Sequence, residues 1–277
     1  MVAKSTRKGF DKNSSQRKNF ERNVNSHRHM LHNFLWGCLC LVMVSCSSSQ
    51  KLVDDNFRPS EENLSQTINQ LPNYNDDLLS VEGKGRAIVS EPGNTERVTI
   101  RFASNQQKSL VTIRNGLGIE GGQLLTDGDT LLIYNKVDKY ARKVPVEGTN
   151  LNRINRLASL NILDMLNYSV KEEDVEKFLE NESLYQLQLK TGAKVYIDKN
   201  SDTVRQVVQP SSTNLPYSKI EYDAYTSMKG FTLPRRISIF GTGGKSKIAL
   251  QLTALELNPK LDTLKIELPD DIPIYYK

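Results

Sequence analysis

The sequence predicts a mainly β protein with short helices (class α+β) whose strands form an antiparallel sheet. From Leu78 onward, most segments place an apolar residue at every second position, as in RVTIRF, which is the pattern of half-buried strands. Turn pairs such as Asp127-Gly128 separate these segments, and their spacing is typical of a meander. A stretch within residues 150–180 instead repeats its apolar residues at helical spacing, which predicts short amphipathic helices.

The N-terminal segment precedes this pattern and resembles an export signal. Its apolar stretch, Leu31 to Val44, follows a basic segment and is shorter than the roughly 20 residues of a membrane span. It ends in MVSCSSSQ, which resembles a bacterial lipobox with Cys46 as the lipidated residue. The alternative is an uncleaved anchor, and translation from Met1 or from Met30 fits the sequence.

Removal of residues 1–45 changes both the charge and the available chemistry. These residues hold eight Lys and Arg but two acidic residues, so the remainder, with 29 basic and 30 acidic residues, has a net charge of −1. This balance argues against nucleic acid as a partner. All His and Cys residues lie at or before Cys46. We therefore expect no His- or Cys-dependent catalysis, no metal and no cofactor, and predict that the protein is not an enzyme.

The remaining chain is predicted to contain one tether and one domain. Residues 46–59 are polar and follow the expected lipidation site, so we interpret them as a flexible tether. Residues 60–277 show no change of composition and are predicted to form a single domain. It begins with a short helix over SEENLSQTINQL, with Ser60 as its N-cap. Near its end, the apolar phase of KIALQLTALEL shifts, which predicts a β-bulge near Thr253.

The helical interlude carries three apolar stripes at helical spacing. It is predicted to form two or three short helices, whose stripes are Leu151, Ile154 and Leu157, then Ile162, Leu163 and Leu166, then Val175, Phe178 and Leu179.

Three motifs suggest binding chemistry but fit ordinary structure better. NGLGIEGG matches G-x-G-x-x-G through Gly116, Gly118 and Gly121, yet a dinucleotide site needs a helix to begin at the third glycine. The segment that follows alternates as a strand, so the glycines are expected to permit turns or close strand approach. GTGGKSK at 241–247 is expected to be a hairpin turn. The acidic run KEEDVEKFLE is expected to be a solvated helix start, not a carboxylate site.

Residues 117–144 carry a resemblance to a known family. The segment LGIEGGQLLTDGDTLLIYNKVDKYARKV resembles the central signature of a Bacteroidota lipoprotein family of unknown function, through Leu117–Glu120, Thr126, Asp127, Asn135 and Tyr140. Gly121-Gly122 stand where that family usually has Ala-Arg. The closing segments GFTLPRRISIF and LPDDIPIYYK extend the resemblance, which spans roughly Leu78 to Tyr276. This family is similar to the LolA/LolB lipoprotein-carrier superfamily.

The resemblance implies a LolA/LolB-like half-barrel, which is a strongly curved antiparallel sheet covered by helices. It also implies that the apolar cavity of the half-barrel binds an acyl chain, a lipid or a lipoprotein. The alternating pattern then assigns a set of cavity-lining candidates: Val98, Ile100, Phe102, Val111, Ile113, Leu131, Ile133, Leu187, Leu189, Ile237, Ile239, Leu250 and Leu252. The helical stripes assign lid candidates: Ile154, Leu157, Ile162, Met165, Leu166 and Phe178.

These inferences together predict a lipid-anchored protein of the cell envelope. It is expected to be attached to the outer membrane through Cys46, facing the periplasm, and to bind lipid without catalysis. An alternative from a different class is a structural or assembly factor that holds another envelope protein. That alternative predicts a large exposed apolar or charged patch outside the cavity.

Overall fold

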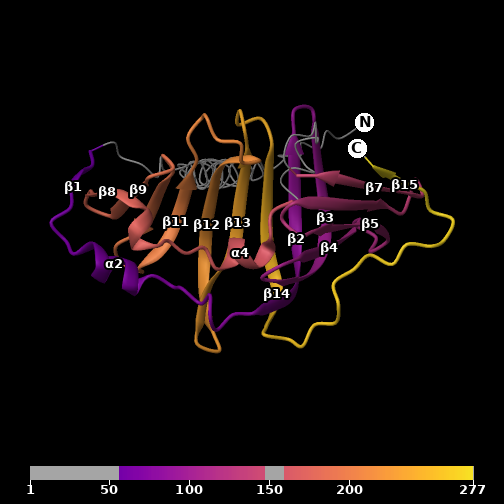
Figure 1. Ribbon diagram of the computed structural model, residues 1–277, viewed down its shortest axis with the longest axis horizontal. Helices are drawn as coiled ribbons and strands as arrows, with labels where there is room; N and C mark the ends of the chain where they lie inside the picture. The colour runs from indigo at the N-terminus through magenta and orange to yellow at the C-terminus, as the bar shows by residue number, and fades with distance from the viewer. Residues whose placement is uncertain (1–55, 147–158, 277) are drawn as a thin grey trace, which may run out of the picture. The chain divides into compact units, whose positions relative to one another are not determined.

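The computed structural model describes residues 56–146 and 159–276, which form one 15-stranded sheet (Figure 1). The predictions for the export signal, for Cys46 and for the lid residues Ile154 and Leu157 lie outside the described residues. Within those residues, none of the helices has the length and apolar character needed to cross a bilayer.

Two antiparallel meanders make up the sheet. The first contains β2 (Ser80–Glu91), β3 (Asn94–Asn105), β4 (Ser109–Arg114), β5 (Glu120–Thr126), β6 (Thr130–Asn135) and β7 (Tyr140–Pro145). The second contains β8 (Val175–Glu180), β9 (Leu184–Leu189), β10 (Lys194–Asp198), β11 (Thr203–Val208), β12 (Tyr217–Met228), β13 (Phe231–Gly241) and β14 (Lys247–Leu257). Because β14 pairs with β2, the end of the second meander joins the start of the first in the middle of the sheet.

Short strands from the two ends of the described chain close the edges of the sheet. β1 (Arg58–Pro59) pairs antiparallel with β8, and β15 (Ile274–Tyr276) pairs parallel with β7. Very short edge strands, and proline within them, limit the pairing of a sheet edge with another chain. The segment expected to be a tether, residues 46–59, thus includes a strand at its end.

Few helices accompany the sheet, so the expected covering by helices is overstated. The described residues contain two α-helices, α2 (Leu64–Gln70) and α4 (Ile162–Leu166), and a 3-10 turn at Glu172–Asp174. The N-cap of α2 is Asn63, whose side chain accepts a hydrogen bond from the Gln66 amide. Ser60 was expected in that role, but its hydroxyl donates to Glu180 on β8 instead.

The third expected helix is a strand, which is a correction to the sequence prediction. Val175, Phe178 and Leu179 lie on β8, which pairs with β9 on one side and β1 on the other. The spacing of these residues is compatible with a helix, but two partner strands satisfy the backbone donors and acceptors of this segment. Phe178 is therefore a strand residue that packs against the main core, not part of a helical lid.

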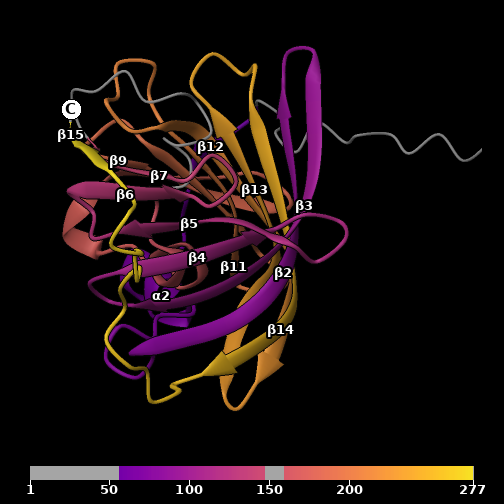
Figure 2. The same ribbon diagram turned by 90° about the vertical axis from the view of Figure 1, so that its right-hand side faces the viewer.

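The sheet is strongly curved, and α4 lies against its concave side (Figure 2). Most buried apolar residues of both meanders form one core on this side, together with α4. A separate small cluster contains Leu124, Leu131 and Val144 of the first meander. The bulge predicted near Thr253 is confirmed, since the register between β14 and β2 shifts between Leu252 and Ala254.

The glycines of NGLGIEGG serve the backbone geometry of the β4–β5 hairpin. Gly118 has a φ of +81° in the turn, a conformation that glycine adopts without steric cost. Gly122 leaves no room for a side chain, because an added Cβ would collide with the Tyr134 carbonyl of β6. A strand follows these glycines, so the helix that a dinucleotide site requires is not there.

Candidate ligand-binding cavity

Apolar side chains from adjacent strands meet in register on the concave face. Cross-strand pairing forms one row across four strands, made of Ile237, Leu250, Ala87 and Val98. A second row is made of Ile239, Ile248 and Val89. A third row pairs Ile100 of β3 with Ile113 of β4. Side chains on one face of neighbouring strands pack against each other, so these rows give a continuous apolar lining.

Glycines on β2 let bulky neighbours lie close to this lining. A Cβ added at Gly83 would be 2.6 Å from the Phe102 ring, and one at Gly85 would be 3.1 Å from a Leu250 methyl group. Since real Cβ contacts are longer than these, larger residues at the two positions would push those side chains out of place.

α4 covers part of the lining, and hydrogen bonds fix its N-terminus to the sheet. The N-cap Asn161 accepts a hydrogen bond from the Leu163 amide at 2.8 Å and another from the Ser104 hydroxyl at 2.7 Å. Its side-chain amide donates to the Asn105 carbonyl at 2.9 Å. Ser104 and Asn105 end β3, so the cap of the helix is also its attachment to the sheet.

The C-terminus of α4 is attached to the segment before β2. Asn167 accepts a hydrogen bond from the Tyr74 amide at 3.0 Å and donates one to the Asn75 side chain at 2.8 Å. Four of the five helix residues are buried, namely Ile162, Leu163, Met165 and Leu166. A helix of five residues is not stable by itself, so these contacts with the sheet hold α4 in place.

A cavity of about 100 Å³ lies between α4 and the sheet. It is lined by Ala87, Val89, Val98, Ile100, Val111, Ile113, Leu124, Leu160, Ile162, Met165, Ile239, Ile248 and Leu250. Every one of these side chains is apolar. A cavity of roughly 150 Å³ accommodates benzene, so this one has room for a few carbon atoms.

The structure places the expected lining residues in three environments. Six line the cavity: Val98, Ile100, Val111, Ile113, Ile239 and Leu250. Five belong to the main core without bordering the cavity: Phe102, Leu187, Leu189, Ile237 and Leu252. Leu131 and Ile133 lie in or against the separate small cluster.

The expected lid residues are also divided. Ile162 and Met165 of α4 face the cavity. Leu166 borders a different, smaller pocket of about 10 Å³, and Phe178 lies on β8. Lining residues that sequence reasoning missed include Ala87, Val89 and Ile248. Alternation marks Val89 and Ile248 as inward-facing, but only the pairing of β14 with β2 brings them together.

The smaller pocket lies on the other side of α4 and is bordered by tyrosines. Tyr168, Tyr222 and Tyr225 line it together with Asn167 and Leu166. The Tyr225 hydroxyl donates to the Val204 carbonyl at 2.7 Å, whereas the Tyr222 hydroxyl is buried without a partner among the described residues. Burial raises the pKa of both tyrosines, so both hydroxyls stay protonated at neutral pH.

The side chains that line the concave cavity are all apolar. No group of three or more His, Cys, Asp or Glu residues that could hold a metal ion occurs in the described parts of the chain. The acidic residues Glu172, Glu173 and Asp174 form an exposed 3-10 turn, away from the apolar lining. What the concave site can do chemically is to remove apolar ligand surface from water.

No protein-family model matches the sequence, and no curated protein matches it. Solved structures do match. The chain is similar to an outer membrane lipoprotein-sorting protein domain from Vibrio parahaemolyticus, with 9% identity and a TM-score of 0.50, over 72% of this chain and 92% of that chain. A LolA superfamily protein from Nitrosomonas europaea has 11% identity and a TM-score of 0.46, over 73% and 97%. A DUF1329 family protein from Desulfovibrio piger has 12% identity and a TM-score of 0.48, over 72% and 92%.

At these identities the likeness concerns the fold alone. The Vibrio parahaemolyticus domain carries the comparison, because its TM-score is the highest of the three. Its likeness extends over nearly all of that domain and over about three quarters of this chain. The chain thus shares the fold of that domain, a large curved sheet of mostly antiparallel strands with few helices.

Proposed function

We propose that the concave cavity binds an acyl chain of a lipid or lipoprotein and that the protein acts as a non-catalytic carrier. The observation that supports this function is the cavity itself, which is bounded by the curved sheet and α4 and lined by apolar side chains only. Each methylene moved from water into such a lining contributes about 0.8 kcal/mol. The lipoprotein-sorting role given for the Vibrio parahaemolyticus domain agrees with this proposal.

Binding requires α4 and the ligand to exchange places. The helix buries Ile162 and Met165 against the same side chains that an acyl chain would contact. The hydrogen bonds of Asn161 and Asn167 oppose its release, so an empty protein stays closed. A ligand that buries more apolar surface than α4 does shifts the balance toward the open form.

The proposal also includes the cellular location. Lipidation of Cys46 would attach the domain to the outer membrane on its periplasmic side, where lipoproteins and phospholipids are the available acyl cargo. The residue lies outside the described chain, and mass spectrometry of the envelope protein before and after Cys46→Ser tests the lipidation directly. Loss of a diacylglyceryl mass is expected in the variant.

A fluorescent fatty-acid probe tests the cavity. Saturable binding to the purified full chain is expected, and Ala87→Phe is expected to weaken it at least tenfold, because the new ring occupies most of the cavity. Ile88→Phe is the matched control, since Ile88 lies on the same strand with its side chain on the opposite face of the sheet and exposed. Thermal unfolding of both variants checks that the fold is retained.

Native mass spectrometry identifies the cargo. The protein is purified from envelopes without detergent, and bound material is extracted into organic solvent. A discrete lipid or acylated peptide supports the carrier function. Probe binding unchanged by Ala87→Phe, together with a co-purifying protein in place of lipid, contradicts it and favours the assembly-factor alternative.

A further inference from the structure

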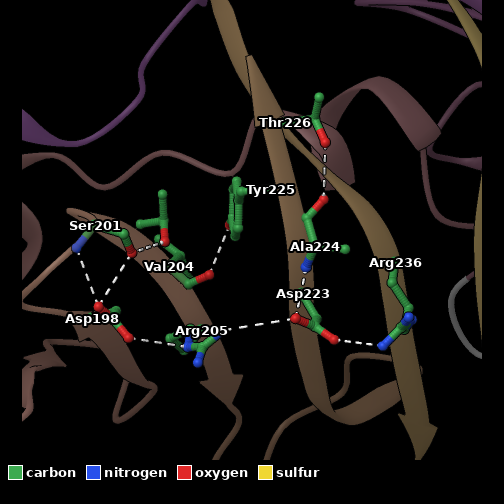
Figure 3. A network of polar contacts seen from close by, with 10 residues as sticks. Asp198, Ser201, Val204, Arg205, Asp223, Ala224, Tyr225, Thr226 and Arg236 are labelled. Atoms are coloured by element: carbon green, nitrogen blue, oxygen red, sulfur yellow. Dashed lines mark hydrogen bonds and ion pairs between the residues drawn. The ribbon is translucent and has the colours of Figure 1, made fainter.

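Four charged residues of the second meander pair with each other on the convex face. Asp198, Arg205, Asp223 and Arg236 form a chain across β10 to β13 (Figure 3). Arg205 lies 3.4 Å from Asp198 and 3.8 Å from Asp223, and Asp223 lies 2.7 Å from Arg236. Within this row of four residues, each arginine lies beside at least one aspartate.

The first meander carries basic side chains on the same face without such partners. They are Lys84 and Arg86 of β2, Arg97 and Arg101 of β3, and Arg114 of β4. Among the described residues, none of these side chains forms an ion pair. We call these five residues the basic face.

Register places the members of the basic face next to one another. Lys84 pairs directly with Arg101, and Thr99 lies between Arg86 and Arg114. Like charges directly opposite each other destabilise a sheet. The carboxylates near this group are engaged elsewhere or repel each other: Glu120 of β5 is paired in register with Arg114 but forms its ion pair with Lys136, and Glu82, two residues before Lys84, faces Glu256 of β14. Such an arrangement weakens the isolated protein, and an anionic partner would relieve the repulsion.

The surface beside the basic face is hollow. A depression of about 480 Å³ is lined by Arg86, Arg97 and Arg236, with Thr99 and Gln251 between them and Gly116 at one side. Guanidinium groups bind phosphate oxygens in pairs of parallel hydrogen bonds, and the threonine and glutamine side chains add further donors. The Arg114 Nε is buried and has no hydrogen-bond partner among the described residues.

Gly116 begins a turn that presents apolar side chains to solvent. Leu117 is 86% exposed and Ile119 is 60% exposed, and Figure 2 shows this β4–β5 connection emerging beside β3. The turn is held in shape, because the Asn115 side chain accepts hydrogen bonds from the amides of Leu117 and Ile119, both at 3.0 Å. Exposed aliphatic side chains on a fixed turn next to cations indicate an interaction surface.

We propose that the convex face docks onto an anionic phospholipid surface. The basic face binds the phosphates of the head groups, while Leu117 and Ile119 enter the boundary with the acyl chains. A bilayer interface presents phosphate and hydrocarbon side by side, which matches cations beside exposed aliphatic residues better than an acidic protein does.

This inference goes beyond the carrier function and does not depend on the cavity. The basic face and the cavity lie on opposite faces of β2 to β4. Docking there would leave the concave side turned away from the bilayer and accessible from the periplasm. Failure of probe binding in the cavity and failure of membrane docking are therefore separate results.

A single tryptophan tests the docking. In the full chain, Trp36→Phe removes the only Trp, and Leu117→Trp then reports on the turn. The protein is reconstituted into vesicles of brominated phosphatidylcholine, with or without phosphatidylglycerol. With phosphatidylglycerol, blue-shifted emission and bromine quenching are expected, and both are expected to decrease as salt is added.

The variants separate docking from general membrane association. Arg86→Gln with Arg97→Gln is expected to lower the ratio of docked to free protein about 30-fold, because each basic residue near an anionic surface contributes a factor of about five. Arg86→Lys with Arg97→Lys keeps the charge and most of the quenching. Lys219→Gln is the matched control, since Lys219 pairs with Glu221 at 2.7 Å, and Leu215→Trp gives a reporter outside the turn.

Equal quenching in both kinds of vesicle, or quenching unaffected by the glutamine substitutions, overturns the proposal. Soluble polyglutamate is added as a second probe. If it shifts the emission of Trp at position 117 while the vesicles do not, the proposal is also overturned, and the face is then a docking site for an acidic protein.

Discussion

The two meanders use the same strand pattern but fill their concave sides differently. In the second meander, Leu187, Val195, Ile197 and Val207 are completely buried at 0% exposure, and the convex charges are paired. In the first, Val98, Val111 and Ile113 are only half-buried around a cavity, and the five residues of the basic face form no ion pair within the described parts of the chain. Strands β8 to β12 therefore behave as the scaffold, whereas the first meander, with β13 and β14 beside it, borders both the cavity and the depression.

The difference shows how one sheet can combine stability with an open site. A densely packed half supplies the free energy of folding, so the other half can keep an incompletely filled apolar lining. A ligand bound in the cavity would then stabilise the folded protein at the part of the sheet that its own side chains pack least densely.

Removing a side chain from each half tests the division directly. Leu187→Ala is expected to lower the free energy of unfolding by about 2–5 kcal/mol, the usual cost of such a cavity in a packed core. Val111→Ala is expected to cost about 1 kcal/mol, because half-buried methyl groups contribute less than fully buried ones. Urea unfolding measures both, with an unchanged dependence on denaturant as the control. Equal losses would show that the two halves are packed alike.

Loss of the α4 cap tests whether the helix is the displaceable part. Asn161→Ala removes the cap of α4 and its bonds to Ser104 and Asn105, at an expected cost of about 1–2 kcal/mol. Because the closed form is weakened, binding of the fatty-acid probe is expected to become tighter.

Asn63→Ala at the cap of α2 is the matched control for Asn161→Ala. It removes an equivalent capping bond, to the Gln66 amide at 3.0 Å, from a helix that does not border the cavity. It is expected to lower stability without changing probe affinity. A tighter-binding Asn63→Ala variant would contradict a specific role of α4.

Two tyrosines on the scaffold half, the buried Tyr222 and the half-buried Tyr225, differ in their hydrogen bonding. Tyr225→Phe loses the bond to the Val204 carbonyl and is expected to cost about 1 kcal/mol. Tyr222→Phe removes a hydroxyl that has no partner in the described part of the chain, so its effect on the free energy of unfolding is expected to be about zero or slightly stabilising. Urea unfolding compares the two. A large loss in Tyr222→Phe would indicate a bound water at this hydroxyl.

Local pattern predicted much of the fold, because strands and turns depend on neighbouring residues. Alternation in RVTIRF and the Asp127-Gly128 turn identified the first meander. Local pattern failed at Val175–Glu180. Its apolar residues have helical spacing, but the segment forms a strand because it pairs with β9 and β1. The same limit applies to Ser60, whose hydroxyl contacts Glu180, 120 residues away in the chain.

The site was harder to predict than the strands. Alternation shows which residues point inward, but curvature and strand order decide which of them border empty space. The alternating pattern makes both Leu187 and Val111 inward-facing, but Leu187 is packed in the core whereas Val111 borders the cavity. Two members of the basic face, Arg97 and Arg101, lie on the polar side of RVTIRF, but the other three come from β2 and β4, which only the fold brings beside them.

The smallest expected effect is at the edge of the scaffold half, where Glu180 joins β1 to β8. Its carboxylate accepts hydrogen bonds from Lys199 at 2.9 Å, Ser60 at 3.2 Å and Arg58 at 3.3 Å. The hydrogen bond from Lys199 is the main reason that the pKa of Glu180 lies below its ordinary value. A carboxyl with a lowered pKa in the folded protein stabilises it above the ordinary carboxyl pKa, and this contribution is lost as the pH falls through the lowered value.

Glu180→Gln is therefore expected to be slightly less stable than the unsubstituted protein at neutral pH, and the difference is expected to vanish on acidification. Thermal unfolding across the acidic range measures it, and Lys199→Met, which removes the principal donor, is expected to give the same convergence. Hydrogen exchange at the Ser60 amide, which bonds to the Phe178 carbonyl at 3.1 Å, shows whether β1 detaches first. If the difference between the proteins stays constant with pH, ionisation of Glu180 is not what holds β1, and the edge of the scaffold depends on its backbone pairing alone.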